Sequence, residues 1–108
     1  MHTVFDINTD EGNIHLDKVG EFKLTLVINE KPFDINGYPK NMIDASRSAI
    51  ERKREYYLIP FTLSTHRGQI SHHPDWDIFI FSLDGHEAFL EGDELKLMTT
   101  CIQDHLCV

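Results

Sequence analysis

A run of alternating apolar and polar residues at positions 22–29 constrains the fold of this chain more than any other segment. Its apolar positions are Phe22, Leu24, Leu26 and Ile28, its polar positions are Lys23, Thr25 and Asn29, and only Val27 is out of phase. An alternation of period two is typical of a β-strand with one buried face. Shorter alternations at 5–7, 14–17 and 33–35 predict further strands, with a turn at 10–12.

The middle of the chain indicates a change from strand to helix and back. The pair Asn36-Gly37 favours a tight type I′ turn. Residues 41–56 carry apolar positions at helical spacing, and Asn41 suits the N-cap. Residues 56–64 alternate again, but Pro60 cannot donate a backbone hydrogen bond, so this strand is expected at a sheet edge or at a bulge.

The last third predicts one more buried strand and a second helix. Residues 66–74 have the composition of a loop. Residues 76–83 are apolar on both faces, which is typical of a strand covered on both sides. The apolar residues Leu95, Met98, Ile102 and Leu106 are spaced for a helix that starts at Gly92 or Asp93. A strand over 95–102 is the alternative, and the helix is preferred.

These patterns predict a single α+β domain over residues 1–108. We expect an antiparallel sheet of about five strands, packed with one central helix over 41–56 and with a C-terminal helix. The sequence shows no internal repeat.

The overall charge excludes some functions. Eighteen acidic and ten basic residues give a formal net charge of -8. This charge argues against direct nucleic-acid binding, which needs Lys and Arg on phosphates, and against an anionic membrane surface. No apolar run approaches the ~20 residues of a membrane span. Cys101 and Cys107 lack the spacing of a zinc site or a disulfide scaffold, so we expect free thiols in the cytoplasm.

Motifs for catalysis are missing from the sequence. We find no phosphate-binding loop, dinucleotide fingerprint, nucleophile elbow or H-E-x-x-H pair. His66, His72, His73 and Asp75 carry groups that can bind zinc, which leaves a small metal-dependent enzyme or ligand-binding domain as an alternative. Their spacing matches no mechanistic motif, so we expect a non-catalytic protein without a metal or other cofactor.

Charge is distributed unevenly along the chain. Residues 1–36 carry a net charge of -4, residues 37–60 carry +2, and residues 61–108 carry -6. The predicted partner-binding residues follow from the last segment and are Asp75, Trp76, Asp77, Asp84, Glu87, Glu91, Asp93 and Glu94. Trp76 is their aromatic anchor. Its alternation with Ile78 and Ile80 instead favours packing in the core, and that interpretation is preferred.

An immunity-type inhibitor is the preferred functional hypothesis. Such a protein neutralises a toxin by direct binding, and an acidic surface is complementary to the basic active site of a nuclease-like toxin. In size, charge and lack of catalytic motifs the chain resembles bacterial toxin-immunity proteins and phage anti-defence inhibitors, although no particular residues carry the resemblance. A structural or regulatory subunit with another basic partner fits the same sequence.

Overall fold

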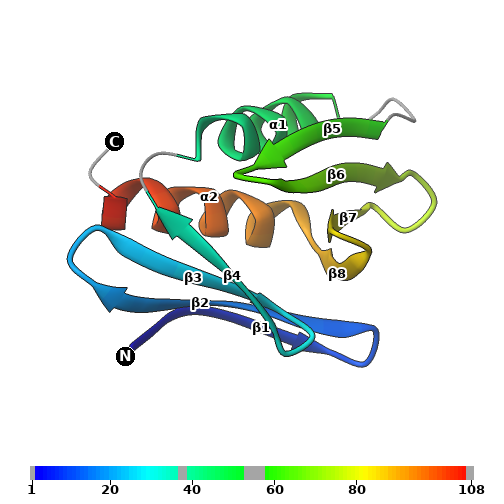
Figure 1. Cartoon of the computed structure of the whole chain (residues 1–108). Helices are drawn as coiled ribbons and strands as arrows, with labels where there is room; N and C mark the ends of the chain where they lie inside the picture. The colour runs from blue at the N-terminus through cyan, green and yellow to red at the C-terminus, as the bar shows by residue number, and fades with distance from the viewer. Residues whose placement is uncertain (1, 37–38, 53–57, 107–108) are drawn as a thin grey trace.

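The computed structural model describes residues 2–36, 39–52 and 58–106, and within them eight strands form two antiparallel sheets (Figure 1). The first sheet contains β1 (His2–Thr9), β2 (Gly12–Gly20), β3 (Lys23–Ile28) and β4 (Lys31–Asn36). Helix α1 (Lys40–Glu51) follows it. The second sheet contains β5 (Leu58–Leu63), β6 (His66–His73), β7 (Ile78–Leu83) and β8 (His86–Leu90), and helix α2 (Gly92–Leu106) follows it.

Each sheet is a meander in which every strand pairs with its neighbours in the chain. Both residues of the β3–β4 turn, Asn29 and Glu30, have positive φ, as do Asp84 and Gly85 of the β7–β8 turn. Positive φ at both central residues is the geometry of a type I′ hairpin turn, which matches the twist of the strands it joins.

The buried residues of β3 and α2 confirm that these segments are a strand and a helix, as the residue pattern predicts. Leu24, Leu26 and Ile28 are buried, as a half-buried strand requires. Phe22, predicted on the same buried face, instead lies in the turn before β3 and is 49% exposed. Residues 92–106 form a helix rather than a strand, and its buried positions include all four predicted ones, Leu95, Met98, Ile102 and Leu106. In Figure 1, α2 lies between the two sheets, where it packs against strands of both.

Several predicted boundaries are corrected. The single sheet of about five strands is instead two sheets of four. Helix α1 spans Lys40–Glu51, and Pro39 rather than Asn41 is the N-cap residue. The predicted helix continues over residues 53–56, which lie outside the described part of the chain, as does Gly37 of the predicted turn.

The predicted loop at 66–74 is mostly strand β6, and β8 was not predicted. Gly68 and His72 occupy positions on the inner face of β6 where the pattern of an ordinary strand would have aliphatic residues.

The predicted position of Trp76 in the core is also corrected. Strand β7 begins at Ile78, and Trp76 lies in the preceding turn with 66% of its surface exposed, so the preferred core position was wrong.

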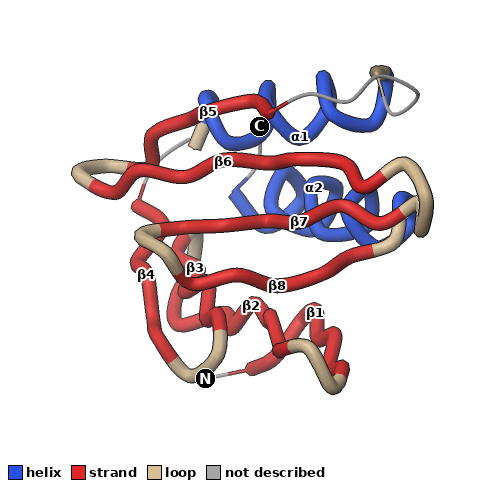
Figure 2. Tube along the Cα trace, turned by 90° about the vertical axis from the view of Figure 1, so that its right-hand side faces the viewer, coloured by secondary structure: helices blue, strands red, loops and turns tan. Residues whose placement is uncertain are grey.

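The order of elements, four strands and then a helix, occurs twice. The first helix does not lie mainly on the sheet that precedes it. Helix α1 packs against β5 and β6 of the second sheet and against α2. Figure 2 shows both helices behind the second sheet, with β8 next to the first sheet. Strand β8 contacts β2 and β3. None of the described helices is long and apolar enough to cross a membrane.

Candidate functional site

Most of the predicted partner-binding residues gather where four segments meet. These are the β1–β2 turn, the β6–β7 turn, the end of β8 and the start of α2. Two adjoining hollows lie here, with volumes of about 560 Å³ and 350 Å³. Both are lined by Trp76, Ile78 and Glu91. We call this region the Trp76 surface and define it by Glu11, Trp76, Asp77, Ile78, Phe89, Glu91, Asp93 and Glu94.

The turn between β6 and β7 presents Trp76 to solvent. The imidazole of His73 stacks against the indole, with ring centroids 4.2 Å apart and planes 9° from parallel. Asp77 has a φ of 51°, which ends the turn before β7 begins. Its Oδ1 atom lies 2.8 Å from Nε2 of His72, a side chain that is only 4% exposed. The indole is therefore oriented by its stack on His73, and the residue that follows it is tied to the buried side chain of His72.

The floor of the larger hollow is apolar. Ile78 of β7 and Phe89 of β8 line it, and both are partly buried. Odd and even positions of a strand point to opposite faces. Phe89 therefore lies on the face of the second sheet opposite to the core residues Ala88 and Leu90.

Carboxylates surround this floor. Glu91 and Glu94 line the larger hollow, together with Glu11 from the β1–β2 turn, and Asp93 lines the smaller one. The Oε1 atom of Glu94 accepts a hydrogen bond of 2.7 Å from the backbone N–H of Glu91. That contact is the reciprocal half of a capping box and fixes Glu94 at the start of α2. Acidic side chains in a first helical turn also stabilise the helix through its dipole.

Three predicted residues lie outside the Trp76 surface: Asp75 is in the β6–β7 turn but lines neither hollow, and Asp84 and Glu87 are farther away. Asp84 follows the end of β7, and Glu87 lies near the start of β8. The hollows are at the other ends of these two strands, beside Ile78 and just after Leu90. The backbone N–H of Arg67 and the side chain of His66 hydrogen-bond Asp84, at 3.0 Å and 2.5 Å. These contacts lower the pKa of the Asp84 carboxyl below its usual value.

The histidines of the alternative metal hypothesis are not brought together. His66 and His72 are at opposite ends of β6, and adjacent His72 and His73 point to opposite faces of the sheet. Asp75 is exposed in the turn that follows. Within residues 2–36, 39–52 and 58–106 no group of three or more His, Cys, Asp or Glu side chains is arranged to hold a metal ion.

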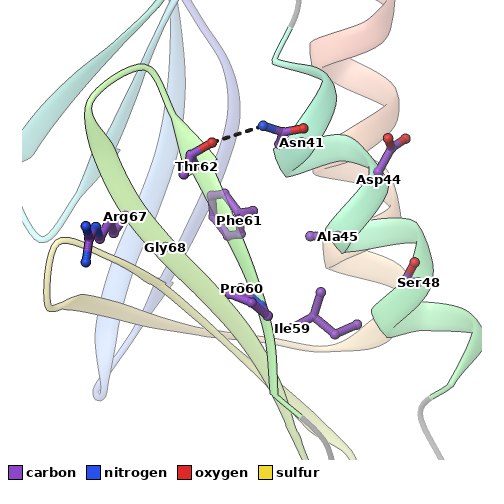
Figure 3. A pocket seen from close by; sticks show the side chains of 10 residues that line it. All are labelled: Asn41, Asp44, Ala45, Ser48, Ile59, Pro60, Phe61, Thr62, Arg67 and Gly68. Atoms are coloured by element: carbon purple, nitrogen blue, oxygen red, sulfur yellow. Dashed lines mark hydrogen bonds between the residues drawn. The ribbon is translucent and has the colours of Figure 1, made fainter.

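A further groove of about 550 Å³, which no sequence pattern predicted, runs between α1 and β5 (Figure 3). Ala45 and Ser48 form its helical wall, and Ile59 and Phe61 lie on the strand opposite. At one end, Nδ2 of Asn41 donates a hydrogen bond of 3.0 Å to Oγ1 of Thr62. The groove depends on a helix and a strand packing together, which no local pattern in the sequence reveals.

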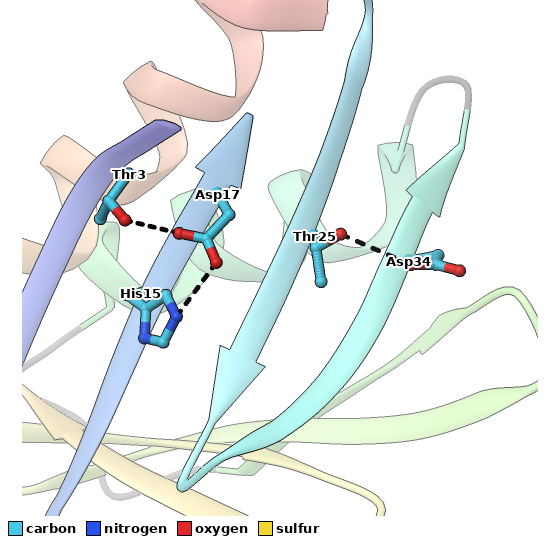
Figure 4. A network of polar contacts seen from close by, with 5 residues as sticks. All are labelled: Thr3, His15, Asp17, Thr25 and Asp34. Atoms are coloured by element: carbon cyan, nitrogen blue, oxygen red, sulfur yellow. Dashed lines mark hydrogen bonds and ion pairs between the residues drawn. The ribbon is translucent and has the colours of Figure 1, made fainter. Parts of the chain in front are cut away.

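A polar network covers part of the first sheet (Figure 4). Asp17 of β2 is 8% exposed. Its carboxylate accepts a hydrogen bond of 2.7 Å from Oγ1 of Thr3 and lies 3.3 Å from Nε2 of His15. Buried carboxylates require such partners, so we assign this network a role in stability.

Comparisons with protein-family models, curated proteins and solved structures give no match for this chain.

Proposed function

We propose that the chain is a non-catalytic inhibitor that binds a basic protein partner through the Trp76 surface. The single observation that carries the proposal is the position of Trp76, which is 66% exposed at the edge of a hollow bordered by carboxylates. Tryptophan is the residue type most enriched among side chains that dominate binding energy at protein interfaces. A large aromatic ring held open to solvent costs solvation free energy that a partner would recover.

The charges around Trp76 support a basic partner. Glu11, Glu91, Asp93 and Glu94 come from three separate elements of the structure and converge on one surface. Convergent charge of one sign accelerates association with a partner of opposite sign and disfavours partners of like sign. A nuclease-like toxin fits this requirement, because its active site must carry positive charge to bind phosphates. The proposed inhibitor would cover that site.

A phage anti-defence inhibitor would use the same surface against a different basic protein. The identity of the neighbouring gene distinguishes these two hypotheses, since an immunity protein is encoded beside its toxin. We place either inhibitor in the cytoplasm. The free thiol of Cys101 in α2 is consistent with a reducing compartment.

The proposal is tested by co-expressing the chain with the product of the neighbouring gene. A one-to-one complex that abolishes the partner's activity is expected. Replacing Trp76 by Ala should weaken the complex at least tenfold, because truncating a central aromatic anchor costs about 2 kcal/mol or more. Phe22→Ala is the matched control, since Phe22 is also an exposed aromatic side chain in a turn, at 49% exposure.

A charge reversal provides the second arm of this test. Glu11→Lys should weaken the complex at low salt, whereas Glu21→Lys should not, because both residues are exposed in hairpin turns of the first sheet but only Glu11 lines the hollow. Full inhibition by the Trp76→Ala and Glu11→Lys variants, both folded by circular dichroism, would contradict the proposal.

A further inference from the structure

The larger hollow of the Trp76 surface has three kinds of wall. The indole of Trp76 supplies an aromatic wall, Ile78 and Phe89 supply an apolar floor, and Glu11 and Glu91 supply carboxylates. An apolar floor favours a side chain with a hydrocarbon stem, and the carboxylates favour a positive group at its end. Only lysine and arginine combine these two properties at neutral pH.

Among the described residues, no side chain neutralises the carboxylates of Glu11 and Glu91. Neither has a hydrogen-bond or ion-pair partner in the described segments. Glu11 lies in the β1–β2 turn and Glu91 directly follows β8, so the two glutamates reach the hollow from different elements. Two acceptors from separate elements suit a cation with several donors in fixed directions.

The indole favours a planar cation over a compact one. One face of the Trp76 ring is covered by the parallel imidazole of His73, at 4.2 Å between centroids. This contact orients the ring before any partner arrives, while 66% of the residue stays accessible. A guanidinium group is planar, weakly hydrated and stacks on aromatic faces, whereas an ammonium group is compact and strongly hydrated.

We infer that the larger hollow receives an arginine side chain of the partner, whose guanidinium stacks on Trp76 and pairs with Glu11 and Glu91. The inference rests on the proposed function and names the partner group that this surface selects. The methylene stem of the arginine lies along Ile78 and Phe89. Asp93 lines only the smaller hollow, and an oxygen of Glu94 already accepts a hydrogen bond from the backbone N–H of Glu91, so these two residues add negative charge to the surface but are left out of the pairing.

The test needs no knowledge of the partner. Trp76 is the only tryptophan of the chain, so intrinsic fluorescence reports directly on the hollow. Three acetylated and amidated tripeptides, Gly-Arg-Gly, Gly-Lys-Gly and Gly-citrulline-Gly, are titrated at low salt. The arginine peptide should give a saturable change with a dissociation constant on the order of 1 mM, a value suited to one side chain. The lysine peptide should bind at least about threefold more weakly, and the uncharged citrulline peptide should give no saturable change.

Matched variants locate the binding. Glu11→Gln and Glu91→Gln should each weaken the arginine peptide by about fivefold, the effect of one partly exposed ion pair. Glu21→Gln, an equal change in the β2–β3 turn, should leave it unchanged. Trp76→Ala removes the fluorescent reporter, so its loss of binding is followed by NMR shifts of backbone amides, with Phe22→Ala as the control.

Two results would overturn the inference. One is an equal response to the arginine, lysine and citrulline peptides, and the other is undiminished binding by folded Glu11→Gln and Glu91→Gln variants. Either result leaves the proposed function intact if Trp76→Ala still disrupts the complex with the whole partner. If instead the arginine peptide binds as expected and the whole partner is unaffected by Trp76→Ala, the proposed function fails and the arginine site stands.

Discussion

The Nδ2 group of Asn29 donates a hydrogen bond of 2.8 Å to the carbonyl oxygen of Glu87 and so joins a turn of the first sheet to an edge strand of the second. The Oδ1 atom of the same side chain accepts a hydrogen bond of 2.8 Å from the backbone N–H of Asn13. One amide thus connects β2, the β3–β4 turn and β8. It lies beside Gly12, where an added Cβ would approach Glu87 O to 3.1 Å.

We expect Asn29→Ala to lower the free energy of unfolding by about 2–3 kcal/mol, from two lost hydrogen bonds and from an alanine at positive φ. The φ of Asn29 is 50°, a conformation that glycine adopts without strain. Asn29→Gly should therefore be less destabilising than Asn29→Ala. Urea denaturation measures both. If the alanine variant and the wild type had the same free energy of unfolding, the amide of Asn29 would not stabilise the contact between the two sheets.

Gly68 is expected to tolerate no side chain. A Cβ at this position would lie 2.8 Å from the carbonyl oxygen of Ser82 and closer still to the ring of Phe61, which covers the glycine. Gly68→Ala must displace both and should cost about 1–3 kcal/mol of stability. Gly20→Ala is the control, because its Cβ would meet only Lys23 atoms at ordinary distances of 3.8 Å or more. Thermal denaturation of both variants checks the prediction.

Asp84 should make stability depend on pH at the acid end. The backbone N–H of Arg67 and then the side chain of His66 hold the pKa of this carboxyl below its usual range, against an opposing effect of burial, and the charges of His66 and His86 add to the lowering. The stabilisation is fully present above the unfolded pKa of about 3.9. It is lost as pH falls through the lower folded pKa.

Asp84→Asn is the variant that tests this dependence. Asparagine tolerates the φ of 49° at this position as well as aspartate does, so backbone strain does not change. The melting temperature should fall at pH 7, and the difference from wild type should shrink below about pH 4. Asp10→Asn, an exposed residue of another hairpin turn, should show no such convergence. A difference that stays constant from pH 7 to pH 2 would contradict the assignment.

Cys101 should react slowly with thiol reagents. Burial raises the pKa of its thiol, the charge of Asp104 adds to the effect, and Sγ lies 3.7 Å from the carbonyl oxygen of Val4. Because only the thiolate is nucleophilic, alkylation at pH 8 should be slower than for a free cysteine peptide. The measurement uses a Cys107→Ser variant so that a single thiol is followed. A rate equal to that of the peptide would show that Cys101 is not protected.

Patterns of strict period were sufficient to predict β3 and α2, because each element displays its buried face within a few residues. Strand β6 was missed because its inner face contains Gly68, and the ring of Phe61 from β5 fills that space. This compensation is visible only after β5 and β6 are paired. The division into two sheets was missed for a similar reason, since antiparallel meanders of four or eight strands have the same local pattern.

The candidate site shows the same limit. Glu91, Asp93 and Glu94 could be selected from the sequence because they belong to its most acidic segment, with Trp76 as the aromatic residue of that segment. Glu11 was not selected, since it reaches the hollow only through the contact of β8 with the first sheet. Trp76 was assigned to the core because it alternates with Ile78 and Ile80. The αL conformation of Asp77 interrupts that alternation before the strand starts.

The placement of α1 on β5 and β6 means that the first half of the chain supplies a helix to the sheet of the second half. A fragment ending after α1 would expose Met42, Ile43 and Ala49, which are buried in the whole protein. A fragment starting at β5 would keep α2 but would leave the inner faces of β5 and β6 without the helix that covers them. Two such pieces, produced separately, should remain poorly structured alone and reassemble on mixing. The fold is thus suited to a split reporter whose halves signal only when they meet.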